Sequence, residues 1–94
     1  MTVPVDFLPQ ADLDLIKHVP FGEHTQLLED IIGRLEHFPE IGVKLDPPDD
    51  FARAHGFGDW EVYWEPIYAS EEEVERVEVL RIVPDTYSRV ELFP

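Results

Sequence analysis

The sequence lacks cysteine altogether, holds only two lysines, and has no long apolar run. Without cysteine, neither a disulfide nor a thiolate metal site can form. No apolar run approaches the roughly 20 residues that a membrane-spanning helix needs. The opening residues, MTVPVDFLPQAD, have neither the basic start nor the apolar stretch of a signal peptide. These absences predict a soluble, cytoplasmic domain with no membrane segment.

Positive charge is scarce as well. The chain has 21 Asp and Glu against seven Lys and Arg, which gives a formal net charge of -14. Nucleic-acid-binding proteins gain most of their affinity from Lys and Arg contacts to phosphates, and a field of this sign repels polyanions. The composition therefore argues against direct DNA binding. An acidic surface also suits solubility, a basic partner or a saline cytoplasm, and composition alone does not choose among these.

Histidine gives no sign of a metal site. The four histidines are His18, His24, His37 and His55. No pair of them has a metal-ligand spacing such as HExxH. We therefore expect solvated histidines, with neither a metal nor a cofactor.

The length of 94 residues fits one domain, 1–94, and its first half predicts one strand and two helices. Alternation over residues 3–7 predicts a short edge strand, because Pro4 lacks an N–H. Residues 8–19, LPQADLDLIKHV, predict a helix that ends before Pro20.

The second helix is predicted over residues 23–39, EHTQLLEDIIGRLEHFP. Its apolar residues recur at the i, i+3, i+4, i+7 spacing of an amphipathic helix. Gly33 costs about 1 kcal/mol relative to Ala within a helix, so its presence predicts close packing there. Residues 39–50, PEIGVKLDPPDD, are predicted to form a loop.

The remainder is predicted to be sheet. In WEVYWEPIY, residues 60–68, the side chains of Trp60, Val62 and Trp64 share one face and Tyr63 lies on the other. Base stacking on these aromatics would need a basic groove, and their neighbours are acidic, so a core role is favoured for the tryptophans. Tyr63 is the best candidate for an exposed aromatic side chain.

Two further strands complete the expected sheet, one at residues 51–55 and one at residues 74–83. Between the last two strands, residues 70–73 fit a helical capping box, but a polar hairpin loop is favoured because strands flank it. The order strand, helix, helix and three strands predicts an α+β domain. Its two helices would pack on one face of a mostly antiparallel, four-stranded sheet.

This order resembles that of the RelE/ParE toxins of bacterial and archaeal toxin–antitoxin systems. Four stretches carry the resemblance: QADLDL, IIGRLEHFPEIGVKL, GFGDWEVYWEP and VEVLRIVPDTYSRV. The resemblance implies a β-α-α-β-β-β fold and an antitoxin-like protein partner. RelE-type members cut mRNA in the ribosomal A site, so the ribosome and its mRNA are further implied partners, whereas ParE-type members act on DNA gyrase. An antitoxin segment would lie in an apolar groove between the two helices.

The chain departs from the family where the chemistry requires positive charge. The family's usual arginine after the aromatic residue of its third strand is replaced here by Glu61, and its usual Gly-His-Arg by Val83-Pro84-Asp85. Cleavage of an RNA phosphodiester needs a base, an acid and positive charge near the developing dianion. Losing one such donor costs about 3–4 kcal/mol in the barrier. We therefore expect an mRNA-interferase-like toxin whose cleavage activity is weakened or lost.

Five residues remain as candidates for a toxin-like catalytic site: Arg53, His55, Arg81, Tyr87 and Arg89. The competing interpretation is that the arginines balance neighbouring acidic side chains at the surface. Two other functions stay open: an acidic interaction or adaptor domain without enzymatic activity, and an ordinary toxin made acidic by a saline cytoplasm.

Overall fold

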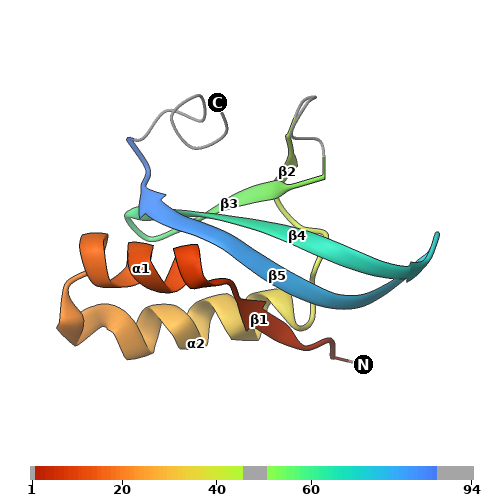
Figure 1. The fold of residues 1–94 in the computed structure, drawn as a ribbon, viewed down its shortest axis with the longest axis horizontal. Coiled ribbons are helices and arrows are strands. Elements are labelled where there is room, and N and C mark those ends of the chain that lie inside the picture. Colours follow the sequence, from red (N-terminus) through yellow and green to blue (C-terminus); the bar gives the residue numbers. More distant parts are fainter. Residues whose placement is uncertain (1, 46–50, 87–94) are drawn as a thin grey trace.

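The computed structural model describes residues 2–45 and 51–86. In chain order the elements are β1 (Val5–Phe7), α1 (Pro9–His18), the 3-10 turn η1 (Phe21–Glu23), α2 (His24–Leu35), β2 (Val43–Lys44), β3 (Arg53–Phe57), β4 (Trp60–Ser70) and β5 (Glu73–Pro84). Both helices lie on the same side of a single sheet (Figure 1). The predicted α+β class is therefore confirmed.

The sheet has five strands in the order β1-β5-β4-β3-β2. β1 is an edge strand, as predicted, and runs parallel to β5, while the other neighbours are antiparallel. The prediction of four strands missed β2, which lies in the stretch expected to be a loop. Gly42 permits this pairing because its φ is +80° and a Cβ there would lie 2.3 Å from the Ala54 carbonyl oxygen.

The two helices begin and end close to the predicted positions. Pro9 stands in the first turn of α1, where its missing N–H is not needed. Beyond the end of α1, the His24 ring nitrogen donates a hydrogen bond to the Val19 carbonyl oxygen (2.8 Å). The prediction that Gly33 marks close packing is wrong, since a Cβ at this position would meet nothing within 4 Å. None of the helices in the described part of the chain is long and apolar enough to span a bilayer.

The main core lies between the helices and the sheet. Its buried members are Ala11, Leu15, Val19, Leu27, Ile31, Leu35, Val62, Trp64, Val77, Val79 and Ile82. Trp64 is fully buried, and its indole N–H donates to the Pro39 carbonyl oxygen (2.8 Å), so the polar edge of the ring is satisfied. Trp60 is half-buried against the same cluster. The predicted core face of β4 is confirmed.

The opposite face of the sheet carries a second, smaller cluster. Its buried members are Leu45, Ala52, Ala54, Tyr63 and Val83. The prediction of an exposed Tyr63 is therefore wrong, because this side chain has no exposed surface. Strand alternation assigned Tyr63 to the correct face, but that face is itself buried at the centre of the sheet.

The last two strands form a long hairpin that extends past both helices (Figure 1). Its turn is Glu71-Glu72, with Ser70 paired to Glu73, so the favoured hairpin is confirmed and the helical capping-box turn does not form. The pairing is irregular between Tyr63 and Trp64. A β-bulge of this kind re-aims side chains on the bulged strand, and Arg81 lies beside this irregularity.

Candidate functional site

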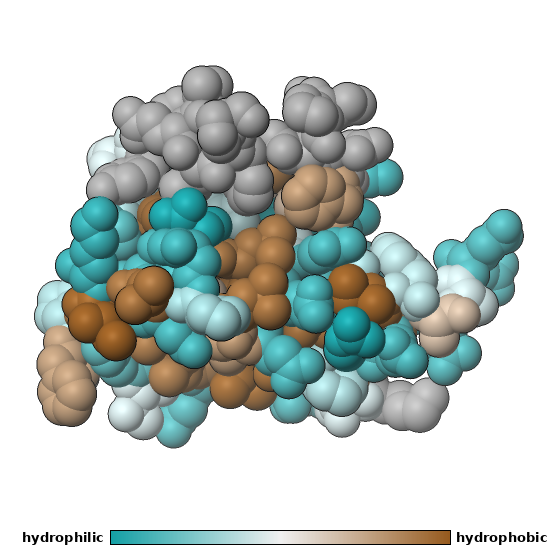
Figure 2. Space-filling model, in the orientation of Figure 1, coloured by the Kyte–Doolittle hydropathy of each residue, from teal (hydrophilic) through white to brown (hydrophobic). Residues whose placement is uncertain are grey.

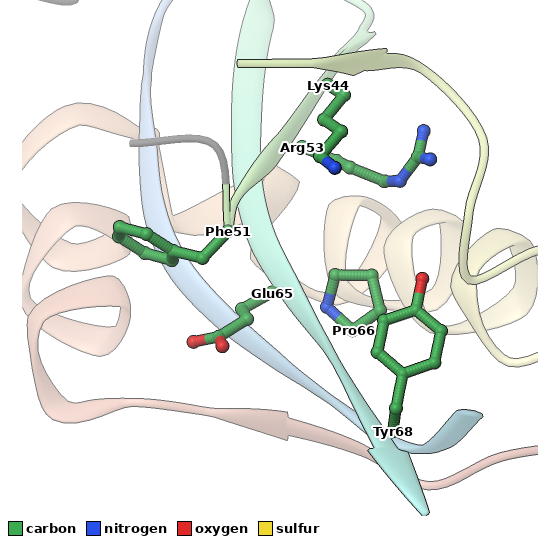
Figure 3. Close-up of a pocket in the computed structure, with 6 residues that line it drawn as sticks. All are labelled: Lys44, Phe51, Arg53, Glu65, Pro66 and Tyr68. Atoms are coloured by element: carbon green, nitrogen blue, oxygen red, sulfur yellow. The ribbon is translucent and has the colours of Figure 1, made fainter. Parts of the chain in front are cut away.

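A pocket of about 230 Å³, which we call the edge pocket, opens at the edge of the sheet around Arg53 (Figure 3). It is lined by Lys44, Phe51, Arg53, Glu65, Pro66 and Tyr68. Arg53 is the first residue of β3 and pairs with Trp64, so β4 continues from Glu65 without β3 beside it. The pocket therefore lies beside β4, just beyond the point where β3 begins.

Two cations face each other at this pocket. Lys44 on β2 is the cross-strand partner of Arg53, and within residues 2–45 and 51–86 neither side chain makes an ion pair. Like charges directly opposite each other on neighbouring strands are destabilising. Figure 3 shows the Tyr68 hydroxyl pointing toward the side of the pocket that carries both cations. Phe51 and Tyr68 are half-exposed, and Figure 3 shows the Phe51 ring pointing away from the two cations.

Two side chains that line this pocket, Tyr68 and Glu65, have raised pKa values. The Tyr68 hydroxyl donates to Glu40 Oε2 (2.5 Å). That hydrogen bond, with burial and the Glu40 charge, raises the pKa of Tyr68 above 10.0, while Arg53 opposes the shift. Burial first, and then the charge of Glu78, raise the pKa of Glu65 above its usual value. The raised pKa makes the Tyr68 hydroxyl a weaker proton donor than a free phenol.

His55 lies two residues further along β3 and lines a different pocket, of about 370 Å³. Its ring packs edge-to-face with the ring of Phe57, with centroids 5.3 Å apart and planes at 82°. The same pocket is lined by two charged side chains of α2, Asp30 and Arg34. Arg53 and His55 thus stand on one strand but open into separate pockets.

Arg81 is held in a structural ion pair. Its Nε and Nη2 atoms donate to the two carboxylate oxygens of Asp14, at 2.6 and 3.1 Å. Asp14 is 1% exposed and also accepts hydrogen bonds from the Ile82 backbone N–H (3.1 Å) and the Gln10 side chain (3.1 Å). Burial alone would raise the pKa of Asp14, but these hydrogen bonds and the Arg81 charge together hold it below 3.8.

The Asp14 carboxylate completes the edge of β5. Beyond Val79, the last residue of β5 paired with β1, α1 lies against the strand, and Asp14 accepts the Ile82 N–H that has no partner in β1. A buried N–H left without an acceptor would cost about 1–3 kcal/mol. Sequence reasoning found Arg81 but missed Asp14, because 67 positions separate the two residues.

Glu61, where the resemblance in sequence implies an arginine, lies on the face of the sheet opposite the helices. Its carboxylate accepts a hydrogen bond from the Tyr63 hydroxyl. An arginine side chain carries only donors, so it could not accept this hydrogen bond, whereas a glutamine could. The glutamate and the buried tyrosine are therefore a matched pair.

The remaining two candidates, Tyr87 and Arg89, lie outside the described residues. Of the other three, Arg53 borders the edge pocket, His55 borders the pocket beside α2, and Arg81 is bound to Asp14. The structure does not bring these three side chains into one site. In the described ranges, no group of three or more histidine or acidic side chains is placed to hold a metal ion.

Comparison with known proteins bears on the fold. No protein-family model matches the chain, and neither does any curated protein sequence. Among solved structures, a chain of the toxin–antitoxin complex RelBE2 from Mycobacterium tuberculosis matches with a TM-score of 0.74 at 21% identity. The match covers 89% of this chain and 99% of that one. The class of fold is therefore RelE-like, as the resemblance in sequence predicted.

Proposed function

We propose that this chain is the toxin-module protein of a toxin–antitoxin system, that it binds an antitoxin-like protein partner, and that its ribosome-dependent mRNA cleavage is weakened or lost. The assignment to a toxin–antitoxin system rests on the similarity in fold to the matched chain, which spans nearly the whole of both chains. The matched chain comes from a toxin–antitoxin complex. The shared fold covers 89% of this chain and 99% of that one, so little of either chain lies outside it.

The placement of the cations supports the loss of cleavage. Arg81 is bound to Asp14 through Nε and Nη2, so this carboxylate already neutralises its charge. Arg53 and Lys44 lie at the sheet edge, and Glu61 places a carboxylate where the family resemblance implies an arginine. A dianionic transition state needs several positive groups aimed at one place. Here Arg53 and Lys44 lie together at the sheet edge, whereas Arg81 is paired with Asp14, so the candidate arginines do not converge on one place.

An exposed apolar surface on α1 supports the proposal that the chain binds a protein partner. Leu13 and Ile16 are 59% and 72% exposed, and Phe21, just beyond the helix, is 88% exposed. Figure 2 shows hydrophobic atoms at the surface in the region of α1. Leu13 and Ile16 lie three residues apart and so share one face of the helix. A partner that covered them would remove apolar area from water, worth about 25 cal/mol per Å².

A growth assay tests the proposal. Induced expression of the wild-type chain should leave growth unimpaired, whereas Glu61→Arg should slow growth if it restores a phosphate-binding charge. Glu61→Gln is the matched control, because its amide oxygen can still accept the Tyr63 hydrogen bond without adding positive charge. Growth arrest by the wild type that disappears in Tyr87→Phe would contradict the loss of cleavage.

The alternative is an acidic interaction domain without enzymatic activity. The net charge of -14 favours it, because a strongly acidic surface attracts basic partners. Binding to such a partner would weaken steeply as salt rises. A partner that keeps part of its affinity at high salt, through apolar contacts to Leu13 and Ile16, favours the toxin-module function instead.

A further inference from the structure

A groove runs between α2 and the β3–β4 turn, on the side of the molecule that holds Trp60. It consists of two adjoining pockets of about 190 and 370 Å³, which share Asp30, Phe57 and Gly58 as lining residues. We call it the α2–β3 groove. It is separate from the edge pocket of Figure 3, which shares none of its lining residues.

The floor of the α2–β3 groove is apolar. Leu27 of α2 is buried there, and the rings of Phe57 and Trp60 are half-buried and pack against the main core. A partially exposed tryptophan that is held by a rigid core loses little side-chain entropy when a partner covers it. Such residues are frequent anchors of protein interfaces.

The rim of the first pocket is acidic on both sides, whereas the second pocket is also lined by Arg34 and His55, so the acidic rim belongs to the first pocket alone. Glu23 and Asp30 project from the η1–α2 side, and Asp59 stands on the opposite side, in the turn between β3 and β4. Gly58 has a φ of +64°, a conformation that other residues adopt with strain, and it fixes the turn that places Asp59. In the ranges 2–45 and 51–86, neither Glu23 nor Asp59 makes an ion pair.

We propose that the α2–β3 groove binds a basic segment of the protein partner, with an aliphatic side chain seated on Phe57 and Trp60 and arginine or lysine side chains reaching Glu23 and Asp59. This deepens the proposed function and rests on its protein partner. The occupant follows from charge complementarity. A chain of net charge -14 attracts cationic segments from a distance, and unpaired carboxylates on both sides of an apolar floor select them on contact.

The test uses the full-length chain and two matched probes. One probe is a short peptide of alanine, leucine and arginine, and the other carries glutamate at every arginine position. The readout is the NMR signal of the Trp60 indole N–H, with the Trp64 indole as an internal reference because it is buried and bonded to Pro39. The arginine peptide should shift the Trp60 signal and leave the Trp64 signal in place, and the glutamate peptide should shift neither.

Two charge-reversal variants separate the groove from the overall field. Glu23→Lys with Asp59→Lys changes the rim, whereas Glu71→Lys with Glu72→Lys makes the same change in net charge at the exposed hairpin turn. The rim variant should weaken binding of the arginine peptide by about tenfold or more, which corresponds to about 1.4 kcal/mol. The hairpin variant should weaken it by less than about threefold, as expected of long-range charge alone.

Three results would overturn the proposal: an arginine peptide that leaves Trp60 unshifted, a glutamate peptide that shifts it equally, or equal losses in the two variants. None of these results depends on toxicity or on mRNA cleavage. A negative result for binding at the α2–β3 groove is therefore distinguishable from a negative result for the proposed function, which the growth assay tests.

Discussion

Arg81 and Arg53 lie in the same sheet but differ in their surroundings: Arg81 has an ion-pair partner, and Arg53 lies opposite another cation. Arg81, on β5, forms a two-pronged ion pair with the buried Asp14. Arg53, on β3, faces Lys44 across the strand boundary and has no ion-pair partner in the described residues. The same side-chain type thus stabilises the fold at one site and leaves uncompensated charge at the other. A motif that names an arginine does not say which of these roles it has.

The largest expected effect comes from breaking the Arg81 pair. Arg81→Ala leaves the Asp14 carboxylate buried without its cation, which should lower the free energy of unfolding by about 3 kcal/mol. Urea denaturation measures the loss. Arg76→Ala is the matched control, since its pair with Glu75 is exposed and its pair with Glu78 is only partly buried, so the loss should be less than about 1 kcal/mol. Equal losses in the two variants would remove the distinction between Arg81 and a surface arginine.

Acid should weaken the protein through Asp14. The folded-state pKa of Asp14 lies below 3.8, its ordinary value, so the unfolded chain binds the proton more readily. The stabilisation is therefore fully present above the unfolded-state pKa and is lost as the pH falls through the folded-state value. Asp14→Asn should reduce the steepness with which the free energy of unfolding falls below about pH 4. Denaturation curves measured from neutral to acidic pH check this, and an unchanged slope would contradict it.

The smallest expected effect lies at the edge pocket. Lys44→Glu replaces a repulsive cross-strand pair by an attractive one with Arg53 and should raise the free energy of unfolding by about 0.2–1 kcal/mol. The gain should shrink in high salt, because both side chains are at least partly exposed. Lys17→Glu, on α1, makes the same change in charge away from this pair and serves as the control. A loss of stability in Lys44→Glu alone would mean that the two cations do not repel.

Local patterns in the sequence predicted the helices and the main core well. The period of apolar residues in α2 and the alternation in β4 each reflect one element packed on one face, which a short window of sequence contains. Trp64 was assigned to the core on that basis, and it is fully buried there.

The features that were missed depend on contacts between distant segments. β2 is only two residues long, and its pairing with β3 spans the stretch that contains Pro47 and Pro48. Tyr63 was placed on the correct face of β4, but burial of that face depends on the residues of other strands. The partner of Arg81 lies on α1, so no motif around β5 could reveal it.

The central proposal is that this RelE-like chain lacks much of the positive charge that mRNA cleavage requires. It is tested most directly by incubating the purified chain with ribosomes programmed with mRNA and mapping the cuts by primer extension. The account predicts no cleavage above background by the wild type and a detectable gain in Glu61→Arg, with Glu61→Gln remaining at background. Efficient cleavage in the A site by the wild-type chain would contradict it.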